Sequence, residues 1–291
     1  MTKPTHTEAE NAANETVSGY GLGAVPDPVD RRNYLLASAA APLDETRAFR
    51  AVTAPDTSRA FGCLIKDMAP IWDQGRLGSC VPHAVDRLIA YARRKQGLPY
   101  VEPSHLYTYW WARYLYGGTP TTLKDTGSAS SLALKSTRQQ GAPPKAAWPY
   151  DIARFAERPP ATADVAAELH QSIESWSIPD GDIAAVQACL AEGWPVTFGV
   201  PIYTNFAVDA ETASVPEPSG SIRGYHELVI RNWRPWDDGY FGIDNSWSTA
   251  WGRRGRAFFP VRYIAEHAFD MWTVRSVEQA AMPAAARKVS P

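Results

Sequence analysis

The chain has few cysteines, no long apolar run and little net charge, and each shortage excludes a class of protein. Only Cys63, Cys80 and Cys189 occur among 291 residues, an odd and low number that excludes a disulfide framework and fits a reducing compartment. The N-terminal stretch "MTKPTHTEAENAANETVSGY" is polar and lacks the apolar core of a signal peptide, and no later run is long enough to span a bilayer. We therefore predict a cytoplasmic protein without a membrane partner, although secretion by a non-classical route would leave no trace here.

Charge and glycine patterns exclude two further classes of ligand. The formal net charge is -2, and Lys and Arg are scattered rather than clustered, so nothing in the sequence indicates a nucleic-acid partner. The glycines of "GYGLGA" do not match GxGxxG and follow no predicted strand, which excludes a dinucleotide loop. Tryptophan and tyrosine, by contrast, are abundant, at 11 and 13 residues, as in proteins with a large aromatic core or an extended cleft.

The chain divides by composition into tails, an extension and one main domain. The N-terminal tail lacks periodicity, as disordered segments do, and the extension after it is rich in Pro, Asp and Ala, which indicates a strap over the domain or a pro-region. The predicted divisions are a disordered tail at 1–18, the extension at 19–69, the main domain at 70–276 with a helical half at about 70–180 and a β half at about 181–276, and a C-terminal tail at 277–291.

Helical periodicity dominates the first half of the main domain. An apolar stripe follows Ser79, a favourable N-cap residue, and ends before Gly97, so we predict a helix that begins at about Cys80. The stretches "PSHLYTYWWARYLYG" and "SASSLALKSTRQQG" repeat this plan, and shorter helices are expected at about 163–174 and 182–192.

After "EGWP" the pattern changes to short runs rich in Val, Ile, Phe, Trp and Tyr. Examples are "PVTFGVPIY", "ELVIRNW" and "GYFGIDNSW", separated by turn residues, and they predict an antiparallel sheet or barrel. Helices followed by strands indicate an α+β fold with two packed halves. A cleft between the halves is the expected position of a site.

Cys80 is the first candidate for chemistry. Free cysteine is most often a buried core residue, and we read Cys189, beside Leu190 in a predicted helix, in that way. Cys80 differs because it lies in the first turn of its helix, where the dipole and unpaired N–H groups favour a thiolate. Gln74, six residues upstream, offers an amide donor beside the thiol.

A base for this thiol is found far along the chain. His226 begins an apolar strand in "GYHELVI", and Asn245 follows 19 residues later in "DNSWSTAWG", near the end of a run that can pair with it. Asn245 could fix the imidazole tautomer and Trp247 could shield that hydrogen bond from water. Taken alone, His226 is better explained as a satisfied buried histidine than as a catalytic base, and we interpret the other five histidines as surface or structural residues.

"QGRLGSC", "GYHELV" and "NSWSTAWG", in this order, resemble the papain-like cysteine peptidases of the C1 family, especially prokaryotic members with "DQGxLGSC". The resemblance extends over most of 70–275. It implies a two-lobed α+β fold in which Cys80 is the nucleophile, His226 the general base and then acid, and Asn245 its orienting group. It also implies an oxyanion hole made by Gln74 and the Cys80 N–H, with Trp247 in support.

The resemblance further implies a substrate-side wall at Gly127 and Ser128, a protein or peptide substrate, and no metal or organic cofactor. Three features depart from the family pattern: Val81 replaces the usual Trp after the cysteine, Glu227 replaces a small residue after the histidine, and Ser248 replaces the glycine of "NSWG". As alternate residues on a strand face opposite sides, Glu227 should point away from His226.

The sequence thus predicts a cysteine peptidase that forms a thioester on Cys80, with three alternatives left open. An amidase, deconjugating enzyme or transpeptidase would use the same acyl-enzyme with a different substrate or acceptor. A catalytically silent module would only hold a peptide in the cleft. Finally, residues 19–69 could occupy the cleft and keep the enzyme inactive, although they contain no recognisable helical pro-region of the family type.

Overall fold

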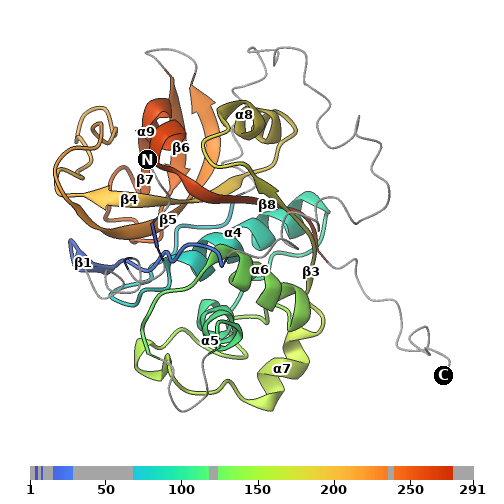
Figure 1. Ribbon diagram of the computed structural model, residues 1–291. Helices are drawn as coiled ribbons and strands as arrows, with labels where there is room; N and C mark the ends of the chain where they lie inside the picture. Colours follow the sequence, from blue (N-terminus) through green and yellow to red (C-terminus); the bar gives the residue numbers. More distant parts are fainter. Residues whose placement is uncertain are drawn as a thin grey trace.

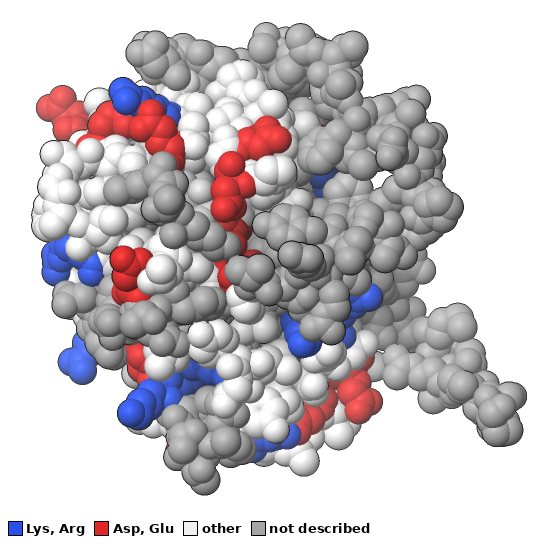
Figure 2. Space-filling view, in the orientation of Figure 1, with Lys and Arg blue, Asp and Glu red and all other residues white. Residues whose placement is uncertain are grey.

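The two halves predicted from the sequence pack against each other around one extensive core. The computed structural model describes residues 4–5, 8, 16–28, 68–117, 124–234 and 239–277. Residues 29–67 of the extension predicted at 19–69, and 278–291 of the C-terminal tail predicted at 277–291, therefore lie outside the described residues. No helix in this described part is long and apolar enough to cross a bilayer. On the face seen in Figure 2, acidic and basic side chains are interspersed.

The helical half is built around α4, Cys80–Lys95. Its residues are buried almost without interruption from Cys80 to Arg93, because the helix lies between the other helices and the sheet (Figure 1). This half confirms the periodicities read from the sequence. The remaining helices of the half are α5 (His105–Leu115), α6 (Ser130–Gln139), the 3-10 helix Ile152–Arg154 and α7 (Ala161–Ala167).

The β half is a six-stranded antiparallel sheet in the order β3-β8-β4-β5-β6-β7. Two helices, α8 (Ile183–Ala191) and α9 (Val261–His267), belong to this part of the chain. The predicted α+β class is confirmed. The strands are β3 (Ser172–Ile178), β4 (Val196–Tyr203), β5 (Ile222–Arg234), β6 (Tyr240–Asp244), β7 (Arg256–Pro260) and β8 (Phe269–Val277).

One predicted helix is wrong in its second part. The helix expected at about 163–174 ends at Ala167, and the chain then enters β3, which pairs with β8. The last four residues of β3, Ser175–Ile178, alternate between polar and apolar, as suits a strand rather than a helix, and the register with β8 shifts at Glu174 just before them. A strand of the β half therefore begins before the division expected at about 180.

An N-terminal strap, residues 16–28, crosses the molecule between the two halves (Figure 1). It begins with a small hairpin of β1 (Thr16–Val17) and β2 (Tyr20–Gly21). Farther along, Leu22 and Val25 are buried in the main hydrophobic core. The strap is therefore integrated with the core of the protein.

A buried cluster of charges fixes the end of β6. The carboxylate of Asp244 lies 3.1 Å from Nη1 of Arg87 and 3.0 Å from Nε of both Arg231 and Arg256. Arg87, on α4, also donates to the backbone carbonyl of Ala69. Asp244 thus connects the central helix and two strands at the residue just before Asn245.

Replacement of the Asp244 carboxylate should destabilise the fold. In Asp244→Asn three guanidinium groups lose their shared counter-charge, and removal of one partner from a buried ion pair costs about 3–5 kcal/mol. Denaturant unfolding measured by tryptophan fluorescence tests this expectation. The exposed pair Arg262–Glu266 supplies the control, since Glu266→Gln should leave the unfolding midpoint unchanged. Equal midpoints for Asp244→Asn and the unmodified chain would contradict the role given to Asp244.

Candidate active site

Cys80 is the first residue of α4, as predicted, but the cap before it differs from the expectation. The Ser79 side chain makes no capping hydrogen bond. Its hydroxyl instead bonds to the Tyr150 hydroxyl at 2.6 Å, and Tyr150 also donates to the Gln74 carbonyl oxygen at 2.9 Å. Ser79 therefore anchors the loop before the helix, and the first N–H groups of α4 are left for other partners.

His226 and Asn245 meet as the sequence predicts. Nε2 of His226, on β5, lies 2.7 Å from Oδ1 of Asn245, which directly follows β6. The two strands are adjacent in the sheet, so the hairpin brings together residues that are 19 positions apart. The Trp247 ring packs on the imidazole with centroids 4.5 Å apart and is fully buried, which shields the hydrogen bond from water.

Gln74 is held by contacts that the sequence did not reveal. Its N–H donates to the Ser246 carbonyl oxygen at 2.9 Å, and its Oε1 accepts from the Ser246 hydroxyl at 2.6 Å. With Oε1 occupied in this way, the amide nitrogen is turned toward the loop before α4. Nε2 donates to the carbonyl oxygens of Leu77, at 2.8 Å, and Gly21, at 2.9 Å.

Gly21 belongs to the strap, so the strap occupies the donor that we predicted for an oxyanion. Farther along, Gly23 N donates to the Tyr225 carbonyl, the Gly23 carbonyl accepts from Ser128 N at 3.0 Å, and Val25 N donates to the Ser128 carbonyl at 3.0 Å. The pairing with Ser128 is parallel. The predicted wall at Gly127 and Ser128 is therefore a main-chain binding edge, and the strap fills it.

The strap fits this cleft because glycine stands at its two narrowest points. A Cβ atom on Gly23 would lie 2.0 Å from the Gly78 carbonyl oxygen, and one on Gly21 would lie 2.5 Å from that of Arg76. From the other wall, a Cβ on Gly127 would lie 2.3 Å from the Gly23 oxygen. Any side chain there would separate the strap from the cleft.

The thiol and the imidazole are both neutral under the strap. Burial raises the pKa of Cys80 to about 12, although the N–H groups of Glu227, Gly23 and Val81 act to lower it. Burial also lowers the pKa of His226 to about 4, although the hydrogen bond of its ring to Asn245 Oδ1 acts to raise it. The helix terminus was expected to favour a thiolate, and with the strap bound that expectation is wrong because exclusion of water has the larger effect.

No hydrogen bond joins His226 to Cys80. Nδ1 of His226 is buried and has no partner among the described residues. This agrees with a neutral thiol beside a neutral ring, and catalytic contacts of this kind often tighten only when substrate is bound.

Glu227 points away from His226, toward another part of the cleft. Its Oε1 accepts from the hydroxyls of Ser130, at 3.0 Å, and Thr197, at 2.6 Å. Burial raises the pKa of this carboxyl well above its ordinary value, and its charge acts to raise the pKa of Cys80. The acid therefore opposes thiolate formation whenever it is ionised.

The other buried histidines belong to the scaffold. His83 and His105 stack with centroids 4.2 Å apart, and His105 bonds to Asp86 at 2.8 Å. Burial lowers the pKa of His105 to about 3. Among the described residues, no three of His, Cys, Asp and Glu are arranged to hold a metal ion.

Comparison with known proteins gives one sequence relative and many structural neighbours. No protein-family model matches the chain. An uncharacterized peptidase C1-like protein of Acanthamoeba polyphaga mimivirus is 27% identical in an alignment of 219 residues that covers 70% of this chain and 69% of the viral protein. Xylellain, a cysteine protease from Xylella fastidiosa, superposes with a TM-score of 0.70 at 24% identity, covering 91% of this chain and 98% of xylellain.

Eukaryotic proenzymes share the same fold at lower identity. Digestive procathepsin L 3 of Tenebrio molitor larval midgut has a TM-score of 0.56 at 15% identity over 72% of this chain and 67% of the procathepsin. The helical half and the β half that meet around Cys80, His226 and Asn245 agree with the fold of these neighbours. In fold this chain is therefore papain-like, and in sequence it is similar to a peptidase C1-like protein.

Proposed function

We propose that the protein is a cysteine peptidase whose active site is made by Cys80, His226, Asn245 and Gln74 within a catalytic domain at 70–276. A peptide or protein would bind along Gly127 and Ser128, where the strap now lies. One observation carries this proposal. The backbone N–H of Glu227, next to His226, faces the sulfur of Cys80, while Asn245 holds the ring of His226 at 2.7 Å.

The chemistry begins when the strap leaves and His226 takes the thiol proton. The Cys80 thiolate attacks the peptide carbonyl carbon, and Gln74 Nε2 and the N–H at the start of α4 donate to the oxyanion. The C–N bond breaks as His226 gives its proton to the leaving nitrogen. A water molecule then gives a proton to His226 and adds to the thioester, the C–S bond breaks, and carboxylic acid and thiol are released.

The strap, residues 16–28, keeps this site latent. Its Gly21 carbonyl occupies the Gln74 donor, and its Gly23 and Val25 occupy the Ser128 edge. Its far end is fixed through Asp27, whose carboxylate accepts from Ser131 N at 2.7 Å and from Trp272 Nε1 at 2.9 Å. A substrate must displace these contacts before it can reach Cys80.

A cytoplasmic location is part of the same proposal. Cys80 and Cys189, the cysteines in the described part of the chain, are both free, as is usual in a reducing compartment. The expected partner is a protein or peptide substrate, with no role for nucleic acid or membrane.

Displacement of the strap should expose the thiol. In Gly23→Val the new side chain collides with the Gly78 backbone, so we expect iodoacetamide to alkylate Cys80 at pH 7 at least tenfold faster than in the unmodified chain. Burial raises the thiol pKa to about 12, and below its pKa each pH unit changes the thiolate fraction tenfold. The rate for the unmodified chain should therefore still rise at pH 10, whereas the Gly23→Val rate should level off at lower pH.

Gly19→Asn is the matched control for this substitution. Gly19 has a φ of +84°, which asparagine tolerates, and a Cβ there meets no atom within 4 Å. Alkylation should be as slow as in the unmodified chain. Equally fast alkylation of all three proteins would show that the strap does not restrict access to Cys80.

Peptide hydrolysis and labelling by an epoxide probe test the proposed function in the Gly23→Val background. Labelling should map to Cys80 and persist in Cys189→Ala. His226→Ala should lower the rate of hydrolysis roughly 10²- to 10⁴-fold, the usual contribution of a general base. Gln74→Ala should lower it roughly 10²- to 10³-fold, as for other oxyanion donors.

A folded Gly23→Val protein that binds peptides but neither hydrolyses them nor reacts at Cys80 would instead be a silent binding module. Amidase, deconjugase or transpeptidase action would appear as turnover of side-chain amides, isopeptides or added amines in preference to peptide hydrolysis.

A further inference from the structure

Ser248 adopts a strained backbone conformation beside the active site. Its φ is +57°, in the left-handed region that is unfavourable for a residue with a side chain. A non-glycine residue held in this conformation near catalytic groups points to a use for its side chain. In this structure the Ser248 side chain contacts a residue of the strap.

The Ser248 hydroxyl bonds to the phenol of Tyr20. The two oxygens are 3.0 Å apart, and Ala250 N donates to the Ser248 oxygen at 3.2 Å, which leaves the serine proton available for the phenol. The Tyr20 ring stacks on Trp247 with centroids 5.4 Å apart and planes within 8°. Since Trp247 in turn packs on His226, a tyrosine side chain lies one ring away from the catalytic imidazole.

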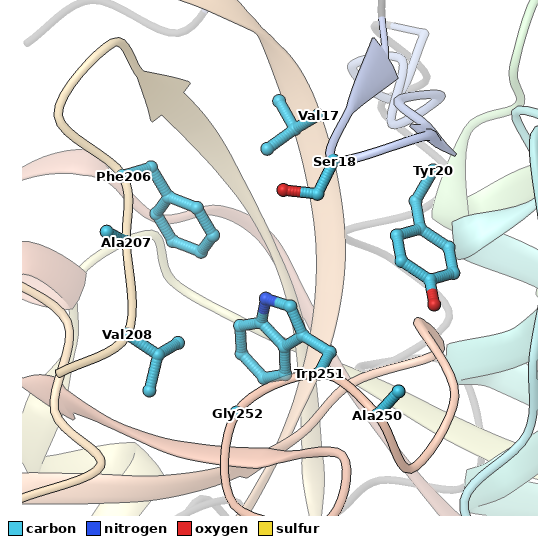
Figure 3. Close-up of a pocket in the computed structure, with 9 residues that line it drawn as sticks. All are labelled: Val17, Ser18, Tyr20, Phe206, Ala207, Val208, Ala250, Trp251 and Gly252. Carbon is cyan, nitrogen blue, oxygen red and sulfur yellow. The ribbon is translucent and has the colours of Figure 1, made fainter. Parts of the chain in front are cut away.

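This tyrosine lies at the edge of an aromatic groove of about 400 Å³. Figure 3 shows Tyr20 on one side of the space, Phe206 on the other and Trp251 between them. Phe206 and Trp251 stack with centroids 6.3 Å apart. The strap's Val17, Ser18 and Tyr20 form one side of this groove. A ring with a polar end, as in tyrosine, fits the place that Tyr20 itself fills, against the Trp247 ring and at hydrogen-bond distance from the Ser248 hydroxyl.

The order of contacts along the strap places the groove relative to the scissile bond. Tyr20 lies on Trp247, Gly21 lies at the Gln74 donor, and Gly23 lies at the Ser128 edge. The groove and the Ser128 edge are therefore on opposite sides of the oxyanion position. Trp247 covers His226, which hands a proton to the leaving nitrogen, so the groove lies on the leaving-group side.

We propose that the place of the Tyr20 ring, on Trp247 at the edge of this groove, is a subsite for a tyrosine side chain of the substrate, on the first residue after the scissile bond, and that Ser248 is the residue that recognises its hydroxyl. The inference rests on the proposed peptidase function. Tyr20 then blocks the enzyme as an internal occupant of the subsite, alongside the main-chain contacts of Gly21 and Gly23.

The test uses the full chain with Tyr20→Ala and Gly23→Val, so that neither the strap nor its tyrosine competes with substrate. Cleavage of a proteome-derived peptide library, analysed by mass spectrometry, should show tyrosine enriched immediately after the scissile bond. For one cleaved peptide and its analogues with Phe or Gly at that position, kcat/KM should favour Tyr over Phe roughly three- to tenfold, as expected for one neutral hydrogen bond.

Two substitutions of Ser248 distinguish the effect of its hydroxyl from the effect of its backbone conformation. Ser248→Gly relieves the strain and Ser248→Ala keeps it, and both should bring the Tyr and Phe peptides to the same kcat/KM. A second measurement uses the chain that keeps Tyr20 and Gly23, in which the strap is intact. Loss of the hydrogen bond between Tyr20 and Ser248 should speed Cys80 alkylation by the same factor in Tyr20→Phe, in Ser248→Ala and in the double variant, because each removes the same bond.

Several results would overturn the proposal. Equal cleavage of Tyr and Phe peptides by the parent, or a Tyr preference that survives both Ser248 substitutions, would refute the subsite while leaving the peptidase intact. Hydrolysis of no peptide at all would refute the proposed function and this inference with it.

Discussion

A short antiparallel pairing between residues 72–74 and 246–248 fixes the geometry of the whole site. Gln74 N donates to the Ser246 carbonyl at 2.9 Å and Ser248 N donates to that of Trp72 at 3.2 Å, while the Ser246 hydroxyl holds the Gln74 amide. The first segment leads directly into Cys80, and the second directly follows Asn245. The nucleophile's loop and the loop that orients the base are thus one hydrogen-bonded unit, and the two halves of the fold cannot shift independently at the cleft.

Exclusion of water by the strap determines the ionisation states of Cys80 and His226. The helix terminus and the backbone N–H groups act to lower the pKa of Cys80, and Asn245 acts to raise that of His226. Burial under the strap reverses both effects, because an ion pair in a dry site must first lose its hydration. The buried Glu227 carboxyl opposes a thiolate as well. In the proposed mechanism, the same residues are neutral while the strap covers them and form the ion pair once water reaches them.

The sequence predicted those parts of the site that local periodicity determines. Helical spacing placed Cys80 at the start of α4, and a pair of adjacent strands brought His226 to Asn245. It could not predict the partner of the Gln74 amide, since Ser246 is 172 positions away, and it assigned Ser79 to a cap because side chains of its type usually cap helices. The helix expected at 163–174 was extended too far because a short amphipathic strand, β3, follows α7 after only a few residues.

The glycines of "GYGLGA" match no nucleotide loop, and their role is explained by close contact with the opposite wall of the cleft. Backbone alternation sends Gly21 and Gly23 toward the carbonyl groups of residues 76–78, where a Cβ has no room, and sends Tyr20 and Leu22 toward Trp247 and the core. Side chains are therefore present only where the cleft has space for them. A segment with this alternation is complementary to the site in its side chains and in its backbone. The strap is consequently a template for what the cleft can hold, and Tyr20 is its most specific part, since a strained serine is retained opposite its hydroxyl.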